Sequence, residues 1–280
     1  MQLTSPVGII AGSGTLPFAV ADSLAERGIG AVLFALNGFC DPERVRSYRH
    51  HWSAIGKAGA IIGGLRAEGC RDVVFIGGLV RPAFSEIRLD LKTLTIIPKL
   101  VAAFRGGDNH LLTGVARIFE DNGFRMRGVA EVAPDLLMPA GAITRVVPDA
   151  TEVQDIAKGR AVLDAMSAFD AGQGVVVIDG HVVALEDIEG TDALLARVAR
   201  LRTDGRLRAR AGRGVLVKAP KITQDLRFDL PALGARTVEG AAAAGLAGIA
   251  VVAGRTVLAE PQAIVEAGDR AGLFVVGTPP

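Results

Sequence analysis

The sequence predicts an α/β protein in two domains, one with a parallel sheet and one with a mixed sheet. A strand at Val7–Ala11, a glycine turn, a helix and a strand at Ala31–Leu36 form a βαβ unit, which implies parallel strands. Two apolar runs on either side of Asp179-Gly180 predict an antiparallel hairpin. Three prolines between residues 134 and 148 predict a linker. We therefore expect domains at 1–133 and 151–280, joined by residues 134–150.

Composition narrows the class of protein. Hydrophobic residues make up 50% of the 280 residues, so each domain can bury a sizeable core. The 31 basic and 30 acidic residues give a net charge of +1, so we expect no binding to nucleic acid. Cys40 and Cys70 fit no metal or redox spacing and predict reduced core thiols of a cytoplasmic protein. No apolar run approaches the roughly 18 residues that span a bilayer, so the protein should be soluble.

The turn after the first strand, Gly12-Ser13-Gly14-Thr15, leads into a helix that is expected to end near Gly28. The N-terminus of such a helix offers amide donors and the positive end of its dipole to an anion. A dinucleotide-binding fingerprint would need a third glycine where Pro17 stands, and an acidic residue where Asn37 follows the second strand. A nicotinamide-dependent oxidoreductase is therefore disfavoured.

The rest of the N-terminal half alternates helices and strands. Asp72–Ile76 is expected to be a strand, and the Gly77-Gly78 pair after it lets a ligand approach the backbone closely. Gly107–His110 resembles a fragment of a metallophosphoesterase motif, but the other motifs of that family are missing, so a capped loop is favoured over a ligand contact. The four histidines have no ligand spacing and predict no zinc site. Further helices are expected at 55–68, 89–104 and 110–121, and a strand at 126–132.

The C-terminal half begins with a helix predicted at Thr151–Phe169, with Thr151 as its N-cap. The hairpin follows, and its Asp-Gly turn suits type I′ geometry. An acidic run from Glu186 to Asp192 then enters a helix predicted at 193–201. Two interpretations of this run stay open and are compatible. Either Thr191 or Asp192 caps the helix, or the run is an acidic loop that faces the site described next.

Residues 214–231, GVLVKAPKITQDLRFDLP, form the most informative stretch of the chain. Residues 215–217 predict a strand, and the segment that leaves it is crowded with polar residues between prolines that forbid a regular helix across it. A solvated connection would explain an arbitrary charged loop. Lysines, an arginine, carboxylates and a hydroxyl together, however, suit a phosphate and a divalent cation. We therefore predict that Asp225 is the centre of the site and ligates the metal.

The end of the chain is expected to complete the second sheet. A helix at 237–246 is made of very small residues, which suits either the wall of an apolar cavity or tight internal packing. Strands are expected at 249–252 and 273–276, with a helix from Pro261 to Gly268 between them. Ala253–Thr256 is predicted to form a second hairpin turn.

Four blocks of this sequence resemble one family, the LpxI-type UDP-2,3-diacylglucosamine diphosphatases of Gram-negative lipid A synthesis. The blocks are GIIAGSGTLP from Gly8, IGGLVRP from Ile76, GQGVVVIDGHVVALEDIEGTDALL from Gly172 and GVLVKAPKITQDLRFDLPALGARTVEGAAAAGLAGIAV from Gly214. The resemblance implies a Rossmann-like N-terminal domain, a distinct C-terminal α/β domain, a lipid held between them, and a homodimer. It also implies a cytoplasmic, Mg²⁺-dependent hydrolase that splits UDP-2,3-diacylglucosamine into UMP and 2,3-diacylglucosamine 1-phosphate (lipid X), with the family's essential aspartate at Asp225.

This substrate gives the predicted site residues their roles. Asp225 is the expected catalytic residue and metal ligand. The expected substrate contacts are Ser13, Gly77, Gly78, Lys218, Lys221, Thr223 and Thr191. The acyl chains require a large apolar cavity, and a lipid substrate requires transient contact with the inner membrane. A lipid or nucleotide carrier without catalysis is the alternative, and it would use the same cavity without needing Asp225.

Overall fold

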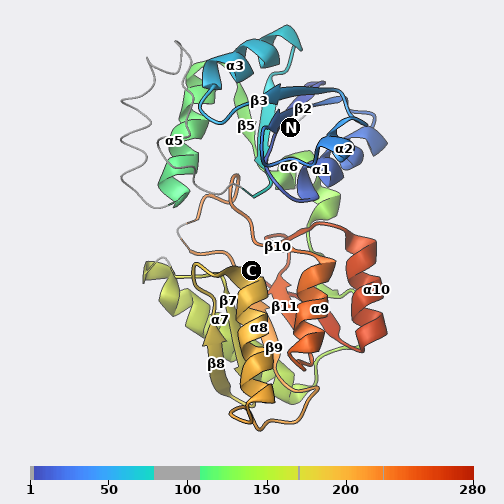
Figure 1. Cartoon of the computed structure of the whole chain (residues 1–280), viewed down its shortest axis with the longest axis vertical. Coiled ribbons are helices and arrows are strands. Elements are labelled where there is room, and N and C mark those ends of the chain that lie inside the picture. The colour runs from blue at the N-terminus through green and yellow to red at the C-terminus, as the bar shows by residue number, and fades with distance from the viewer. Residues whose placement is uncertain (1–2, 79–107, 170, 223) are drawn as a thin grey trace. The chain divides into compact units, whose positions relative to one another are not determined.

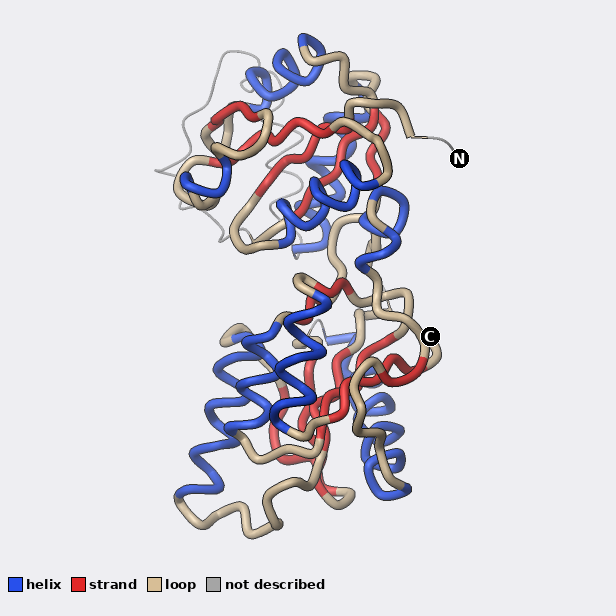
Figure 2. Tube along the Cα trace, turned by 90° about the vertical axis from the view of Figure 1, so that its right-hand side faces the viewer, coloured by secondary structure: helices blue, strands red, loops and turns tan. Residues whose placement is uncertain are grey.

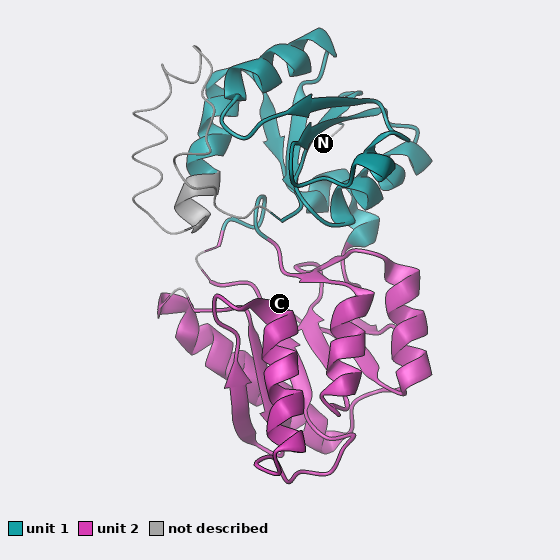
Figure 3. Ribbon diagram, viewed as in Figure 1, with its two compact units in different colours: residues 1–136, 225–229 teal, residues 137–224, 230–280 magenta. Residues whose placement is uncertain are grey.

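The computed structural model divides the chain into two compact units (Figure 3). It describes residues 3–78, 108–169, 171–222 and 224–280. Unit 1 consists of residues 1–136 and 225–229, and unit 2 of residues 137–224 and 230–280. The short segment Asp225–Asp229 therefore belongs to unit 1, although the chain on both sides of it belongs to unit 2. The helix predicted at 89–104 lies outside the described residues.

Unit 1 contains a parallel sheet, as predicted. Within the described residues its five strands have the order β3-β2-β1-β4-β5, and every pairing between them is parallel. Its elements are β1 (Val7–Ala11), α1 (Leu16–Glu26), β2 (Ala31–Leu36), α2 (Pro42–Val45), β3 (His50–Ser53), α3 (Ala58–Ala67), β4 (Asp72–Ile76), α5 (Asp108–Asp121), β5 (Arg125–Arg127), α6 (Val129–Val132) and the 3-10 helix η2 (Pro134–Leu136).

Helices cover both faces of this sheet (Figure 1). Ile10, Phe34 and Phe75 point to the face covered by α3 and α5, where they pack against Leu65 and Phe119. The opposite face is covered by α1 and α6, which contact the sheet and each other. Because side chains alternate between the faces of a strand, the fully apolar β1 and β2 can serve both layers, as buried parallel strands do.

Two parts of unit 1 differ from the sequence prediction. The strand predicted at 126–132 ends at Arg127, because α6 begins after Gly128 and the side chain of Glu131 accepts a hydrogen bond from the Gly128 amide (3.2 Å). The sequence also gave no sign of β3, which pairs with β2 through His50 and His51. Its sequence HHWS lacks the alternation of apolar and polar residues that identifies a strand.

Unit 2 contains the predicted mixed sheet, in the order β6-β13-β11-β9-β7-β8, and a separate two-stranded sheet, β10-β12. Strands β9, β11 and β13 are parallel, whereas β6, and β7 with β8, add antiparallel pairings. Its elements are β6 (Gly141–Ala142), α7 (Ala150–Met166), η3 (Ser167–Phe169), β7 (Gly174–Ile178), β8 (His181–Leu185), α8 (Gly190–Thr203), β9 (Val215–Lys218), β10 (Ala232–Leu233), α9 (Ala235–Ala243), β11 (Gly248–Val252), β12 (Val257–Leu258), α10 (Pro261–Ala271) and β13 (Phe274–Thr278).

The sheet of unit 2 also lies between two layers of helices (Figure 2). Val175 and Val177 belong to the cluster that packs against Leu163 of α7. Val176 and Leu216, which point to the other face, belong to the cluster shared with α8, α9 and α10. The continuous apolar runs of the strands are therefore explained by burial on both faces.

Residues 134–150, which we predicted as a linker, are divided between the two units. Pro134–Leu136 forms η2 in unit 1, and Gly141–Ala142 pairs with β13 in unit 2. The N-cap of α7 is Asp149 rather than Thr151, since its carboxylate accepts hydrogen bonds from the amides of residues 151 and 152. The hairpin at Asp179-Gly180 is confirmed, with positive φ at both turn residues (48° and 77°) as a type I′ turn requires.

The second predicted hairpin, at Ala253–Thr256, is wrong. Val257, which follows the turn, pairs in parallel with Ala232 of β10 and not with the preceding strand β11. The small residues of α9 are explained by packing within unit 2, because a β-carbon on Gly240 would lie 3.0 Å from Leu195 of α8. Of the two interpretations of this helix, tight internal packing is therefore the one that the structure supports.

The two cysteines and the helix lengths also bear on the sequence predictions. Cys40 and Cys70 are free and buried, as predicted. Across the parts of the chain that the structure describes, no helix combines the length and the apolar character needed to cross a membrane.

Candidate active site

Two turns of unit 1 meet at the carboxyl edge of its sheet, one after β1 and one after β4. The Ser13 amide donates to the Gly78 carbonyl (2.8 Å), and the Gly78 amide donates to the Ser13 carbonyl (3.0 Å). The Ser13 hydroxyl also donates to the Gly78 carbonyl (3.0 Å). The strand order reverses between β1 and β4, and open α/β sheets commonly bind ligands at such a point. The structure thus brings the predicted residues Ser13, Gly77 and Gly78 together.

The glycines in these turns have a structural role of their own. A β-carbon on Gly77 would lie 2.7 Å from the Ser13 carbonyl oxygen, and one on Gly12 would lie 2.6 Å from the Gly78 carbonyl oxygen. Gly77 also has a φ of +102°, which favours glycine. Ser13 and Gly78 were predicted as substrate contacts, and in this structure their amides donate hydrogen bonds between the two turns.

A second cluster lies at the carboxyl edge of the unit 2 sheet, around Lys218 at the end of β9. The Lys218 side chain is buried, and its Nζ donates to Thr191 Oγ1 (2.6 Å) and to the Ala232 carbonyl (3.4 Å). The Thr191 hydroxyl in turn donates to Glu186 Oε2 (3.1 Å). Burial lowers the pKa of Lys218, while Glu186 and Asp192 act in the opposite direction. Two predicted contacts, Lys218 and Thr191, therefore adjoin, and Glu186 is a partner that the prediction did not name.

The acidic run before α8 does not cap this helix with Thr191 or Asp192. The helix begins at Gly190, and Glu189 stands at its N-cap position without a capping side-chain bond. Asp192 pairs with Arg236 (2.6 Å). Since Thr191 lies inside the first turn, its hydroxyl is directed to Lys218 rather than to a helix amide.

Asp225 begins a single turn that packs in unit 1. Its carbonyl accepts hydrogen bonds from the amides of Phe228 (3.0 Å) and Asp229 (3.2 Å). The Phe228 ring packs on the unit 1 core, with its centroid 5.9 Å from that of Phe75. A β-carbon on Gly128 would lie 3.1 Å from the Arg227 α-carbon, so the turn sits directly against this glycine. The turn that begins at Asp225 is therefore held in place by the contacts that Arg227 and Phe228 make with unit 1.

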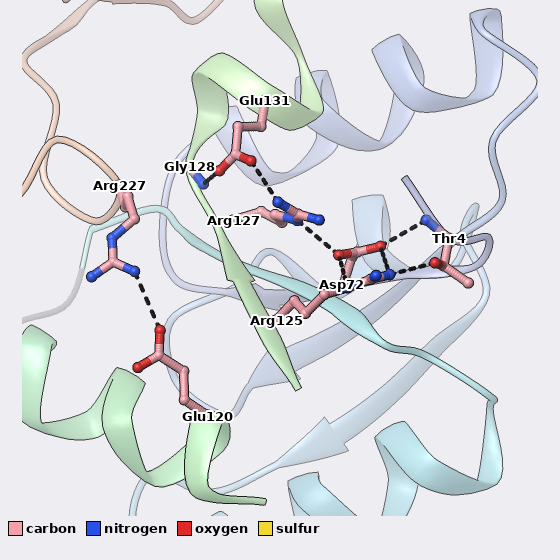
Figure 4. A network of polar contacts seen from close by, with 8 residues as sticks. All are labelled: Thr4, Asp72, Glu120, Arg125, Arg127, Gly128, Glu131 and Arg227. Atoms are coloured by element: carbon pink, nitrogen blue, oxygen red, sulfur yellow. Dashed lines mark hydrogen bonds and ion pairs between the residues drawn. The ribbon is translucent and has the colours of Figure 1, made fainter. Parts of the chain in front are cut away.

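Arg227 holds the carboxylate of Asp225, and Figure 4 shows its second partner, Glu120. Its backbone amide and its Nε donate to Asp225 Oδ1 (3.1 Å each), and its Nη2 donates to Oδ2 (2.8 Å). Nη1 of the same guanidinium donates to Glu120 Oε1 (3.2 Å) on α5. The side-chain hydrogen bond from Arg227 lowers the pKa of Asp225, although partial burial opposes it. Asp225 is therefore an ionised carboxylate at neutral pH.

The segment between Lys218 and Asp225 is an ordered loop. The Lys221 amide donates to Gln224 Oε1 (2.8 Å), which also accepts from Gln173 Nε2 (3.2 Å). The Ile222 amide donates to Ser167 Oγ (2.7 Å). The predicted contact Thr223 lies outside the described residues. Side chains thus take over the backbone hydrogen bonds that no helix or strand supplies here.

The predicted site residues belong to different units. Ser13, Gly77, Gly78 and Asp225 are in unit 1, and Lys218, Lys221 and Thr191 are in unit 2. Prediction gave no role to Arg227, although it stood in the stretch that attracted attention. Glu120 carried no signal at all, because 107 residues separate it from Arg227 and its helix pattern is ordinary.

The carboxylates around Arg227 suit Mg²⁺, which binds few protein ligands, better than a metal ion that protein side chains alone would coordinate. Within the described residues, no group of three or more His, Cys, Asp and Glu side chains could hold a metal ion. Mg²⁺, however, usually keeps several waters and binds one or two carboxylates together with phosphate oxygens of a substrate. Asp225 is ionised and 25% exposed, so its carboxylate is the donor that such an ion would use, whereas Glu120 is paired with Arg227.

Comparisons with known proteins identify the family. The model of the LpxI N-terminal domain matches residues 6–136, and the model of the LpxI C-terminal domain matches residues 139–276. A relative from Caulobacter vibrioides (strain ATCC 19089 / CIP 103742 / CB 15), named UDP-2,3-diacylglucosamine pyrophosphatase LpxI, is 42% identical over 274 residues, which cover 98% of each chain. With both domain models matched in order and a relative that is similar over nearly its whole length, this chain belongs to the LpxI family.

Proposed function

We propose that this protein hydrolyses the pyrophosphate of UDP-2,3-diacylglucosamine, in the presence of Mg²⁺, to UMP and 2,3-diacylglucosamine 1-phosphate in lipid A biosynthesis. The observation that carries the proposal is the similarity, over 98% of both chains, to a relative named for the pyrophosphatase activity on this substrate. The geometry supports the proposal with an ionised carboxylate, since the pKa of Asp225 is lowered and the residue lies on a turn that unit 1 holds in place.

Each side chain at the site has a chemical task in this proposal. Asp225 would hold Mg²⁺, and Arg227 links the carboxylate of Asp225 to that of Glu120. When bound, Mg²⁺ would neutralise charge on the non-bridging oxygens and on the departing phosphate. Lys218 and Lys221 remain the proposed phosphate contacts, and Thr191 orients the Lys218 ammonium through its hydroxyl.

The turns at Ser13 and Gly77-Gly78 are proposed to meet the substrate from unit 1. Their position at the reversal of strand order supports this role, because open α/β sheets commonly bind ligands at such a point. The Ser13 and Gly78 amides each donate to the carbonyl of the other residue, so the Ser13 hydroxyl is the group proposed to contact the substrate here. A Ser13→Ala variant with an unchanged KM for the lipid nucleotide would exclude this contact.

The partners that we expect from the resemblance are also proposals. A lipid substrate must leave a bilayer before it reaches the site, so contact with the inner membrane should be transient and should depend on substrate in the vesicles. Flotation of the protein with vesicles that lack the substrate would argue for a permanent membrane site instead. The homodimer is tested by the mass of the protein in solution, and a monomeric mass at assay concentration would contradict it.

The central experiment measures UMP release from UDP-2,3-diacylglucosamine, with Mg²⁺ and with a chelator, for the parent and for Asp225→Asn. We expect release to require Mg²⁺ and to fall by roughly 100-fold or more in the variant, since metal-assisted charge stabilisation contributes several kcal/mol and each 1.36 kcal/mol is tenfold in rate. Asp269→Asn is the matched control, because Asp269 also accepts from a backbone amide and a side chain of one arginine, Arg145, in unit 2.

Three results would change the proposal in different ways. Release that survives in Asp225→Asn would keep the reaction but place the metal elsewhere. UMP release that a chelator leaves unchanged would mean that the reaction does not require Mg²⁺. Tight binding of the lipid nucleotide without any release of UMP would favour the carrier.

A further inference from the structure

Arg227 contacts two carboxylates at once, and the reaction as proposed gives this arrangement no task. Its guanidinium donates two hydrogen bonds to Asp225 and one to Glu120. Together with the Arg227 amide, these bonds take up both carboxylate oxygens of Asp225. A cation that binds Asp225 needs the lone pairs of the same oxygens, so it has to compete with the guanidinium.

The backbone of Arg227 is fixed more firmly than its charged group. The α-carbon lies against Gly128, where a β-carbon would come within 3.1 Å of it, and the neighbouring Phe228 packs on the core of unit 1. The guanidinium lies 4.7 Å from the centroid of the Phe228 ring, which supports a cation in several orientations over its face. The side chain can therefore turn between its two partners without movement of the chain.

The exposure of the three charged groups makes such a movement inexpensive. The side chains of Asp225, Glu120 and Arg227 are 25%, 39% and 43% exposed, respectively. Ion pairs that are open to water contribute little free energy, because water solvates each partner when the pair opens. Glu120 already accepts one hydrogen bond from Arg227, so the guanidinium has a second anionic partner when it leaves the first.

We propose that Arg227 is a positioning residue that exchanges partners, holding Asp225 before a divalent cation binds and moving fully to Glu120 when the cation takes the Asp225 carboxylate. This inference rests on the proposed function, because it takes Asp225 as the metal ligand. In this scheme Arg227 keeps the Asp225 carboxylate oriented and sets the affinity of the metal site. It also prevents a cation from binding tightly in the absence of substrate phosphates.

The test measures Mn²⁺ affinity without substrate, by the electron paramagnetic resonance signal of free Mn²⁺. We expect Arg227→Gln to bind Mn²⁺ roughly three- to tenfold more tightly than the parent, because the competing bidentate pair is gone. Arg227→Lys should bind more tightly than the parent by a smaller factor, since one ammonium group cannot span both oxygens of Asp225 and also reach Glu120. Glu120→Gln should bind more weakly, because Arg227 loses its second partner.

Two variants serve as controls. Asp225→Asn should lose the site, and Arg145→Gln should match the parent, because Arg145 makes the same kind of contact with Asp269 in unit 2. The fluorescence of Trp52, the single tryptophan, reports whether unit 1 is folded in each variant.

The outcomes separate the exchange from the function on which it rests. Parent-like or weaker affinity in Arg227→Gln would overturn the exchange. Affinity that rises in Arg227→Gln but is unchanged in Arg227→Lys would also overturn it, because net charge alone would then explain the effect. If the parent binds no Mn²⁺ and its UMP release does not depend on Mg²⁺, the proposed function has no metal requirement. The proposed exchange of partners by Arg227 would then also be wrong.

Discussion

Two of the arginine–carboxylate clusters among the described residues of unit 1 differ in burial; Figure 4 shows the cluster around Asp72 and, from the other, the pair of Arg227 and Glu120. In the first, Asp72 is fully buried and accepts hydrogen bonds from Arg127 Nε (2.7 Å), Arg125 Nε (2.9 Å) and the Thr4 amide (2.7 Å). In the second, Arg227 joins Asp225 and Glu120, and all three side chains reach water (43%, 25% and 39% exposed). The same two chemical groups therefore occur in one unit in two different environments.

The comparison teaches that burial, rather than the number of hydrogen bonds, separates an ion pair that stabilises the fold from one whose partners can exchange. The Asp72 cluster ties β4 to β5 and to the N-terminal segment, and loss of Asp72 would remove the buried partner of the buried Arg127. In the Asp225 cluster, water replaces a lost partner at little cost. We expect the first cluster to govern stability and the second to govern activity.

The largest expected effect on stability is that of Asp72→Asn. The substitution leaves the buried Arg127 with only its ion pair to Glu131 (2.7 Å), so the free energy of unfolding of unit 1 should fall by roughly 3–5 kcal/mol. Denaturant titration followed by the fluorescence of Trp52, which lies in β3, measures the unfolding of this unit.

Glu43→Gln is the control for Asp72→Asn within the same unit. Glu43 pairs with Arg46 in water, with side chains 75% and 69% exposed, and its loss should change the free energy of unfolding by less than about 1 kcal/mol. Equal losses in the two variants would mean that burial does not distinguish the clusters.

A smaller effect is expected in the acid range. Burial by itself raises the pKa of Asp72, but hydrogen bonds from the Thr4 amide, Arg127 and Arg125 outweigh burial, so the pKa is lowered. The stability that this carboxylate contributes is fully present above its unfolded pKa of about 3.9 and is lost as pH falls through the lower folded value. Below about pH 4 the parent should therefore lose stability more steeply than Asp72→Asn. Parallel curves of unfolding free energy against pH would contradict this linkage.

The smallest effect on stability is expected for Arg227→Gln. Since its partners are open to water, we expect the free energy of unfolding of unit 1 to change by no more than about 1 kcal/mol, whereas Mn²⁺ affinity changes as described above. The same titration of Trp52 fluorescence checks this expectation. A loss as large as that of Asp72→Asn would show that Arg227 is a structural residue and would end the contrast between the clusters.

Much of the fold could be predicted from local patterns. The strands β1, β2 and β4 have the predicted bounds, because apolar runs bounded by glycine and polar turns leave few alternatives. The hairpin at Asp179-Gly180 was predictable because two adjacent positive φ angles are met by very few residue pairs. In contrast, β3 and the pairing of β10 with β12 depend on partners that are distant in the sequence.

The candidate site was only partly predictable. Charged residues after β9 directed attention to Asp225, because such residues gather at the ends of strands in α/β proteins. The pattern did not reveal that Lys218 is buried against Thr191, or that Arg227 is shared with a glutamate of α5. Such contacts join residues between 27 and 107 positions apart, and no local rule reports them.

The sequence by itself determined the α/β class, the parallel and mixed sheets and the family to which the chain belongs, because these follow from periodicity, turn residues and long motifs. Only the tertiary structure decided that Asp225–Asp229 packs with unit 1, and that of two similar arginine–carboxylate clusters one is buried and the other open to water. The physical reason is that desolvation depends on everything packed around a charge, and most of those neighbours are remote in the chain.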